Sequence, residues 1–362
     1  MPDEKLHVSR KSLKIPAQVT CLASGQTDQL LVGSDDGSVR VYDLAAMKVM
    51  KAIRGLAPVS SVVWKPQTES HPGHLFVATG RQVLTFSVHT DKMILTSCDA
   101  HAELVIGSDD NDLVNELTIN AKGNQLAYCL DSGIVGVIDL SNNKVVRMKQ
   151  SHDTVCGSVR FIPDRPGELV SGGYDSTLLH FGSLQASVLS RDNLGTITPS
   201  SGMSMSPPFV VSLSISSTGI IAAGTADGRV YVGTSGEKSH EAGAGRQKRR
   251  RKWEGLRSEG RIIVEVAQGP VTGLTFTSPR EFLTCTLLGS VTSHEICGSA
   301  TTDNLSVKPK WSYSAEDIFK VNAIVTLGNL VIIGGFQEDG GGIIEVWRKT
   351  SVNAADGSTE TK

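Results

Sequence analysis

Short apolar runs alternate with polar turns along the whole chain, and one pattern of this kind occurs seven times. The clearest copy, LLVGSDDGSVRVYDL at residues 30–44, has an apolar run, a turn with aspartate and an alternating strand that ends on an aromatic–Asp pair. Alternation with a period of two is typical of half-buried strands, and stretches with the helical period are nearly absent. The pattern therefore predicts an all-β protein built from repeated units. The other copies lie at residues 74–88, 125–140, 168–184, 220–234, 282–296 and 330–349.

Further strands flank these copies. An alternating segment precedes the second copy at residues 58–66 (PVSSVVWKP), and another, at residues 48–55 (KVMKAIRG), follows the first. The turn centres of the copies lie 44 to 62 residues apart, near residues 36, 80, 131, 175, 227, 289 and 339. Four strands at this spacing are typical of the blades of a β-propeller. Long α-solenoids and parallel α/β folds do not fit the pattern.

The two ends of the chain indicate how the ring closes. The last copy ends at Trp347-Arg348-Lys349 with no outer strand after it, whereas the spare segment LHVSRKSLKI at residues 6–15 precedes the first blade. We expect this segment to supply the outer strand of the seventh blade, because closure removes unpaired sheet edges. The sequence thus predicts a seven-bladed β-propeller over residues 1–349, closed by its N-terminal strand, and a disordered polar tail at residues 350–362.

The spacing of polar residues around the turns resembles the WD-repeat propeller family. In that family a His, a Ser or Thr, the turn Asp and an aromatic residue form a buried hydrogen-bonded brace within a blade. The resemblance assigns these places in blade four to His152, Ser171 and Asp175, with Phe181 in the aromatic place. Phe181 has no hydrogen-bond donor, so the brace would lack its fourth partner. The turn aspartates of three other blades are Asp36, Asp131 and Asp227.

Residues 124–175, with the pattern SHDTVCGSVRFIPDRPGELVS inside them, resemble the WD repeat-containing protein 53 family, as does the later SPPFVVSLSIS. This resemblance implies a substrate receptor for cullin-4 ubiquitin ligases that docks on their damaged-DNA-binding adaptor. Such receptors often carry Trp-Asp-x-Arg at the end of a blade strand. The equivalent segments here, Tyr42-Asp43-Leu44-Ala45 and Ile138-Asp139-Leu140-Ser141, both lack the arginine, and Trp347-Arg348 lacks the Asp.

Composition and motifs favour a non-enzymatic, intracellular protein. The net charge is -2 over 362 residues, which excludes a globally basic nucleic-acid binder. The six cysteines form no CxxC pair, no run of 18 apolar residues occurs, and the first residues are too polar for a signal peptide. No GxSxG, HExxH or Walker motif is present. His152 and Ser171 could be a base and a nucleophile, but their place in the repeat favours the structural brace. We therefore expect no cofactor, metal, membrane or small-molecule substrate.

A long insertion in blade five departs from the repeat. Residues 235–260 contain the run RQKRRRK, and their Gly, Ser and Glu content predicts an exposed loop. Three interpretations remain open: a nuclear-import signal, contact with nucleic-acid phosphates, or a solubilising loop. The first predicts a protein of both nucleus and cytoplasm. Trp253, beside the run, could stack on a base. The basic residues are Arg246, Lys248, Arg249, Arg250, Arg251 and Lys252.

Function in such a ring depends on its surface loops. Candidate partner-binding positions at turns are Arg54, Asp110 and Tyr174. The sequence predicts a protein-interaction scaffold, with the cullin-4 receptor as its specific form. The alternative is a nuclear scaffold associated with RNA or chromatin, for example in ribosome assembly, that uses the basic run.

Overall fold

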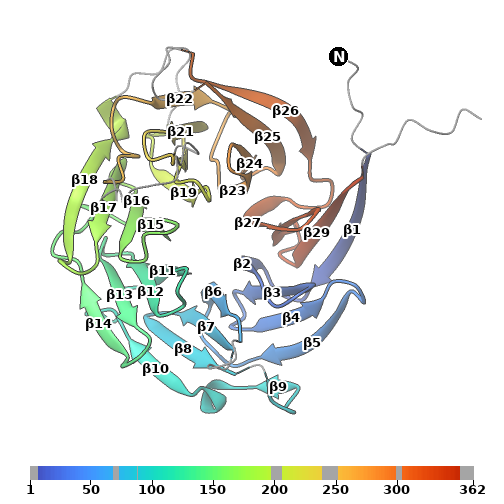
Figure 1. Ribbon diagram of the computed structural model, residues 1–362. Coiled ribbons are helices and arrows are strands. Elements are labelled where there is room, and N and C mark those ends of the chain that lie inside the picture. The colour runs from blue at the N-terminus through green and yellow to red at the C-terminus, as the bar shows by residue number, and fades with distance from the viewer. Residues whose placement is uncertain are drawn as a thin grey trace, which may run out of the picture.

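The computed structural model describes residues 7–67, 73–87, 89–196, 206–238, 252–298 and 304–350. These residues form seven sheets, mostly of four antiparallel strands, that are arranged in a ring around a central channel (Figure 1). The sheets follow one another around the ring in chain order, as the repeat predicts. The prediction of an all-β, seven-bladed propeller is confirmed.

Each blade extends from an inner strand at the channel to an outer strand at the rim of the ring. In this order, blades one to three contain β2 (Val19–Ser24), β3 (Gln29–Ser34), β4 (Val39–Asp43) and β5 (Lys48–Ile53); β6 (Val59–Lys65), β7 (His74–Thr79), β8 (Gln82–Phe86) and β10 (Ala102–Val105); and β11 (Val114–Ile119), β12 (Gln125–Leu130), β13 (Val135–Asp139) and β14 (Lys144–Arg147). Blades four and five contain β15 (Cys156–Phe161), β16 (Glu168–Gly173), β17 (Thr177–Gly182) and β18 (Ser187–Asn193); and β19 (Val210–Ile215), β20 (Ile221–Thr225), β21 (Arg229–Gly233) and β22 (Arg261–Glu265). Blades six and seven contain β23 (Gly273–Ser278), β24 (Glu281–Cys285), β25 (Ser290–Cys297) and β26 (Ser306–Ser314); and β27 (Lys320–Leu327), β28 (Leu330–Phe336), β29 (Gly342–Thr350) and β1 (His7–Ile15).

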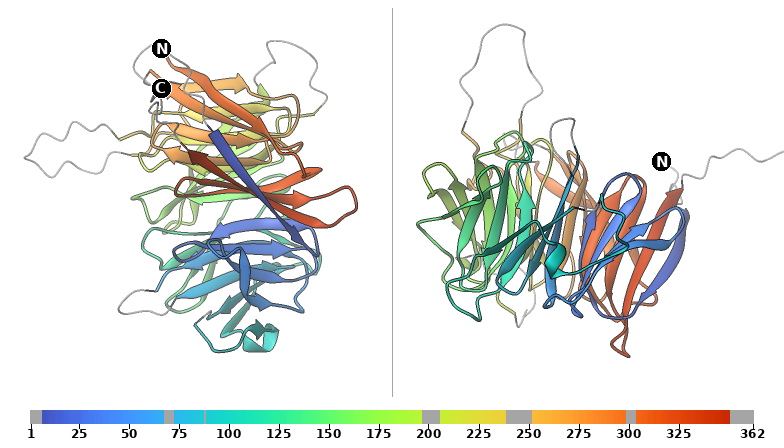
Figure 2. Two further views of the ribbon diagram at one scale, coloured as in Figure 1. Left: turned by 90° about the vertical axis from the view of Figure 1, so that its right-hand side faces the viewer. Right: turned by 90° about the horizontal axis from the view of Figure 1, so that it is seen from below.

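The N-terminal strand closes the ring. β1 pairs antiparallel with β29 along its whole length, from His7 opposite Thr350 to Ile15 opposite Gly342, and is the outer strand of blade seven (Figure 2). Side chains also anchor it, because Arg10 forms an ion pair with Glu316 and its guanidinium lies 5.1 Å from the centre of the Trp347 ring. The first and last described strands therefore share one sheet, and β1 covers the edge that β29 would otherwise leave open.

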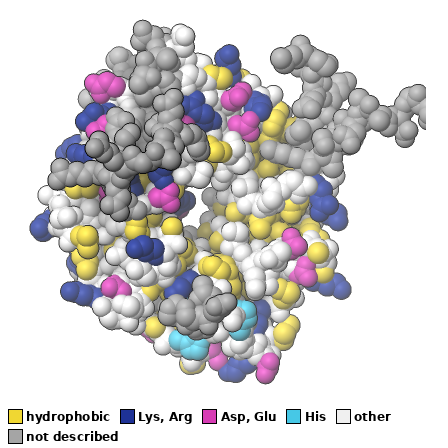
Figure 3. Space-filling model, viewed as in Figure 1, with side chains coloured by type: hydrophobic (Ala, Val, Ile, Leu, Met, Phe, Trp, Pro, Cys, Tyr) yellow, Lys and Arg dark blue, Asp and Glu magenta, His cyan; other side chains and the backbone are white. Residues whose placement is uncertain are grey.

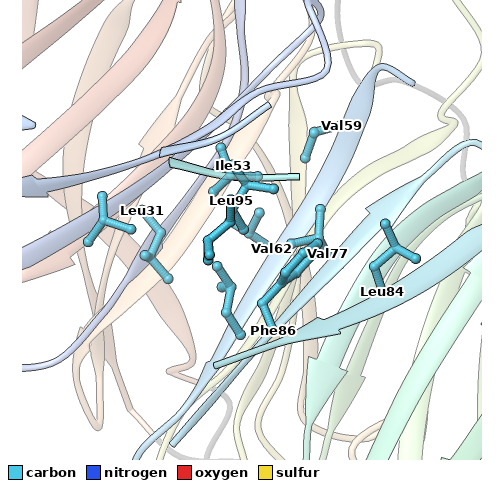
Figure 4. Packing of buried hydrophobic residues seen from close by; sticks show 11 residues of the cluster. Leu31, Ile53, Val59, Val62, Val77, Leu84, Phe86 and Leu95 are labelled. Carbon is cyan, nitrogen blue, oxygen red and sulfur yellow. The ribbon is translucent and has the colours of Figure 1, made fainter. Parts of the chain in front are cut away.

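The apolar core lies between the blades. The buried apolar residues fall into seven clusters, and each cluster combines residues of two neighbouring blades. Figure 4 shows the cluster between blades one and two, where Leu31 and Ile53 of blade one pack against Val77 and Phe86 of blade two. Successive side chains of a strand point to opposite faces of its sheet, so the continuous buried runs of β3 and β4 place apolar side chains on both faces. Stacking seven such sheets in a ring buries both faces.

The sequence pattern missed one strand. β9 (Ile94–Leu95) lies in the long connection between β8 and β10 of blade two, yet it pairs in parallel with β5, with Ala52 opposite Ile94. Blade one therefore has five strands. Besides strands, the described residues contain two short 3₁₀ helices, η1 (Ser97–Asp99) and η2 (Leu194–Thr196). No helix in the described part of the chain is long and apolar enough to span a membrane.

Candidate protein-interaction surface

The connections between strands lie on two faces of the ring. Because neighbouring strands within a blade are antiparallel, the connections alternate between these faces. We call face A the one with the connections that lead into the inner strands and those between the second and third strands. Face B has the other connections, and it faces the viewer in Figures 1 and 3. The described loops of face A are residues 16–18, 35–38, 54–58, 80–81, 106–113, 131–134, 148–155, 174–176, 194–196, 206–209, 226–228, 266–272, 286–289, 315–319 and 337–341.

The structure brings the three candidate brace residues of blade four together. His152 Nδ1 lies 3.0 Å from Asp175 Oδ1, and His152 Nε2 lies 2.7 Å from Ser171 Oγ. Burial opposes the charged form of His152, but hydrogen bonds to Asp175 and Cys156 raise its pKa to about 9. The imidazolium therefore donates one hydrogen bond to the carboxylate and the other to the hydroxyl.

This arrangement is enclosed by the blade. Ser171 is completely buried, and His152 is 2% exposed, so no substrate reaches the hydroxyl. Asp175 also accepts hydrogen bonds from the backbone N–H groups of Thr177 and Asp153, each at 3.1 Å. Phe181 is fully buried among apolar side chains. The geometry is that of a structural link between the connection into β15 and the turn after β16.

The other turn aspartates also bind their own surroundings. Asp36 accepts hydrogen bonds from the backbone N–H and hydroxyl of Ser38 and forms an ion pair with Arg40. Asp227 forms an ion pair with Arg229 at 2.6 Å. In blade three Asp131 accepts a hydrogen bond from Asn115 Nδ2 at 2.9 Å. Each carboxylate therefore holds its turn or the neighbouring inner strand in place.

A belt of polar side chains around the channel was missed by sequence reasoning. Near the start of most inner strands, a polar side chain donates a hydrogen bond to a backbone carbonyl of the next blade. Register shifts at Thr20, Ser60, Asn115 and Asn322 indicate β-bulges, which turn an extra side chain toward the neighbour. The donor and acceptor pairs are Thr20 and Val59, Ser60 and Val114, Asn115 and Cys156, Ser212 and Val271, Thr272 and Val321, and Asn322 and Val19.

Blades four and five meet differently. The belt position of blade four is Gly157, which has no side chain, and a Cβ there would lie 3.0 Å from the Tyr174 ring. Tyr174 stacks on Phe209 with 5.5 Å between the ring centres. Since Phe209 precedes the inner strand of blade five, this aromatic pair joins the two blades where the belt has no side chain.

The candidate partner-binding residues all lie on face A, in loops of different blades. Arg54 is exposed in the connection from blade one to blade two. Asp110 is exposed between blades two and three and forms an ion pair with Arg81. Tyr174 is 37% exposed in blade four. They share a face but not one local cluster.

Face A also has exposed apolar side chains that sequence reasoning did not single out. Leu288 is 71% exposed, Leu113 is 46% exposed and Phe319 is 43% exposed. The sequence could have indicated Leu288, because the sixth repeat has the apolar Leu-Leu-Gly at the turn where the first repeat has the polar Asp-Asp-Gly. Exposed aspartate and glutamate side chains surround these residues on the same face: Asp35, Asp36, Asp109, Asp110, Asp153, Glu316, Asp317, Glu338 and Asp339.

The insertion of blade five is only partly described. Arg246, Lys248 and Arg249 to Arg251 lie outside the described residues, as do residues 351–362 of the predicted tail, whereas Lys252 is exposed on face B. The expectation that Trp253 is free to stack on a base is wrong. Trp253 is 2% exposed, donates a hydrogen bond from Nε1 to the carbonyl of Gly219, and packs edge-on against His180.

Within the described ranges, no group of three or more His, Cys, Asp or Glu side chains has the geometry of a metal site. A family model described as WD domain, G-beta repeat, matches residues 9–43, which cover most of β1 and the first three strands of blade one. Residues 9–43 are thus similar to a WD repeat. A WD-repeat propeller is typical of scaffolds for interactions with other proteins.

One curated relative is the "WD repeat-containing protein 53 homolog" of Dictyostelium discoideum. This chain is 25% identical to it in an alignment of 235 positions that covers 59% of this chain. The same alignment covers 61% of the relative, so the similarity extends over about three fifths of each protein. The similarity agrees with the family resemblance of residues 124–175.

Proposed function

We propose that this propeller is a non-enzymatic substrate receptor of a cullin-4 ubiquitin ligase. In this proposal face A binds the protein to be modified, and strand ends on face B dock on the ligase adaptor. The observation that carries the first half is the exposure of Leu113, Tyr174, Leu288 and Phe319 on one face of a rigid ring. They are spread over loops of several blades, and exposed aromatic and apolar side chains supply much of the contact at protein interfaces.

The second half is supported by the likeness to the WD repeat-containing protein 53 homolog and its family. The two segments that replace the family's docking motif both lie on face B. Asp43 accepts hydrogen bonds from the backbone N–H groups of Ala45 and Ala46, and Asp139 accepts one from Ser141. Adaptor docking without the motif's arginine would therefore rely on the shape of these ordered turns.

Direct binding of the full chain to the purified adaptor tests the ligase role. We expect saturable binding by biolayer interferometry, and a loss of at least tenfold in affinity for an Ala45→Trp/Asp139→Lys variant, which changes both strand ends. Leu288→Asp, on face A, should bind the adaptor normally but recover fewer partner proteins from cells. If the unmodified chain does not bind the adaptor, the ligase role is wrong.

A second role rests on the basic run at residues 246–252, which contains six Lys or Arg residues in seven. We propose that this run directs the protein to the nucleus, so that it is present in both nucleus and cytoplasm. Fluorescence microscopy of the tagged chain, with and without neutralisation of the run, tests this. If neutralisation instead removes bound RNA or chromatin proteins and no adaptor is recovered, the nuclear scaffold replaces the ligase receptor.

A further inference from the structure

A pocket of about 490 Å³ lies on face B between blades two and three. Its apolar lining includes Phe76 of β7, Ile119 of β11 and Leu140 after β13. We call it the blade two–three pocket. It is also lined by Lys65, Pro66, His74, Thr85, His101, Ala102, Asn120, Ala121, Lys122, Gly123, Asn124, Ser141 and Asn143. Its volume is within the usual range for ligand sites, about 300–1,000 Å³.

The pocket's floor is held rigidly by Asn120, which is 3% exposed. Its side chain donates hydrogen bonds to Asn124 Oδ1 and to the carbonyl of Pro166, and it accepts bonds from the backbone N–H groups of Asn124 and Gln125. These bonds fix the turn at residues 120–124 before any ligand arrives. A preformed site loses less conformational entropy on binding.

Cationic and donor groups line the rim of this apolar space. Lys122 is exposed at the tip of the turn, and the Lys65 side chain lies along the same turn, because a Cβ at Gly123 would be 3.5 Å from Lys65 Cε. Within the described residues neither lysine forms an ion pair, and none of the residues that line the pocket is acidic. The positive charge at the rim is therefore not neutralised by its own lining.

One wall is aromatic. His74 and His101 meet edge-to-face with 6.4 Å between ring centres, and His74 lies 6.4 Å from Phe76. Histidine side chains gather near the lower edge of this face in the space-filling view (Figure 3). An apolar side chain entering the pocket would contact these rings and Leu140, while its neighbours in sequence would lie at the lysine rim.

We propose that the blade two–three pocket binds a partner-protein segment in which a bulky apolar residue is next to aspartate, glutamate or a phosphorylated residue. The apolar side chain fills the space lined by Phe76, Ile119 and Leu140, and the anion pairs with Lys65 and Lys122. The positive rim selects acidic segments, because a basic segment would place its own positive charges next to Lys65 and Lys122. This assignment does not require the ligase role. Ala45→Trp alone separates the two, because Ala45 does not line the pocket, whereas Asp139 accepts a hydrogen bond from the lining residue Ser141.

Binding to a peptide array tests the proposal. The array presents nine-residue sequences in which acidic, phosphorylated, basic and neutral residues are placed at each position around one Phe, Leu or Trp. The unmodified full chain should prefer sequences with an anion within two residues of the apolar side chain. Fluorescence anisotropy of the best peptide should then show at least tenfold weaker binding when salt is raised from 50 to 300 mM.

Two variants change the pocket in different ways. Lys65→Glu/Lys122→Glu reverses the rim charge, and Ala121→Trp places a large ring at an exposed lining position. Each should weaken the peptide at least tenfold. Lys144→Glu/Lys149→Glu is the matched control, because it makes the same charge change at two exposed lysines outside the lining and should leave the affinity within twofold.

Several results would overturn the assignment. These are a preference for basic or uncharged sequences, no preference at all, or equal binding by the unmodified chain and both pocket variants. Binding of phenyl phosphate or RNA at this pocket without any peptide preference would also replace the peptide with another ligand. Circular dichroism of each variant confirms that a loss of affinity is not a loss of fold.

Discussion

Replacement of Asp175 by Asn should make the stability of the propeller less dependent on pH. In the folded chain burial disfavours protonation of His152, yet its hydrogen bonds raise the pKa from 6.5 to about 9. A raised pKa contributes stability that is fully present below the unfolded value and is lost as the pH rises through the folded value. The stability that protonated His152 contributes is therefore lost between about pH 6.5 and pH 9.

The size of the effect follows from the shift. The rise of the pKa from 6.5 to about 9, at 1.36 kcal/mol for each pKa unit, gives roughly 3 kcal/mol. Asp175→Asn keeps the size of the side chain but removes the charge that pairs with His152 at 3.0 Å. The buried imidazole then stays neutral. We expect the variant to be destabilised by about 3 kcal/mol at pH 6.5 and by much less at pH 9.

Urea unfolding of the full chain at pH 6.5, 7.5 and 9, followed by circular dichroism, measures this difference. Asp131→Asn is the matched control, because Asp131 pairs with the neutral amide of Asn115 and with no histidine. Its effect on the free energy of unfolding should be the same at each pH. If Asp175→Asn costs as much at pH 9 as at pH 6.5, His152 is not charged in the folded blade and the reasoning fails.

Two substitutions and one deletion, with their controls, test the packing and the closure of the ring. Trp253→Ala should lower the free energy of unfolding by about 3–5 kcal/mol in urea titration, because the ring is 2% exposed, whereas exposed Lys252→Ala should change it by less than about 0.5 kcal/mol. Gly136→Ala should cost about 1–3 kcal/mol, since its Cβ would lie 2.3 Å from the hydroxyl of Tyr128 and 2.4 Å from Cζ of its ring. Tyr128→Phe in the same chain should recover only a small part of that loss, because the ring carbon stays in place. Deletion of residues 1–15 should lower the melting temperature and produce aggregation that light scattering detects, because β29 then becomes an open edge. If the shortened chain stays monomeric and its melting temperature is unchanged, β1 does not close the ring.

The architecture could be predicted from the sequence because each blade repeats one local pattern. The turn between β3 and β4, with Asp36 and Gly37, has the same chemistry as the turn with Asp227 and Gly228 between β20 and β21, and both glycines have positive φ. Alternation specifies strands, and the number of copies of the pattern specifies the number of blades. The closing role of residues 6–15 followed from counting strands, since blade seven lacked one.

Contacts between elements from different repeats could not be predicted in this way. β9 has only two residues and binds the preceding blade, so no period within its own segment indicates it. Trp253 lies beside a run of basic residues, and composition alone favoured exposure. Its burial depends on His180 in blade four and on the carbonyl of Gly219 in blade five, which are distant in sequence.

The polar belt shows why some of the hydrogen bonds that stabilise a propeller cannot be predicted from the repeat pattern. Inner strands of adjacent blades diverge, so their backbones do not form a continuous ladder, and the first carbonyls of each inner strand need other partners. Thr20, Asn115 and Asn322 supply such partners with three different side chains. What the fold requires is a donor of suitable reach at the bulge, and several residue types meet that need. Gly157 has no side chain to donate such a bond, and at this position the Tyr174–Phe209 stack joins the blades through apolar contact. The seam between blades four and five therefore depends on side chains that are partly exposed on face A, so a partner that binds Tyr174 would also alter the contact that holds this seam.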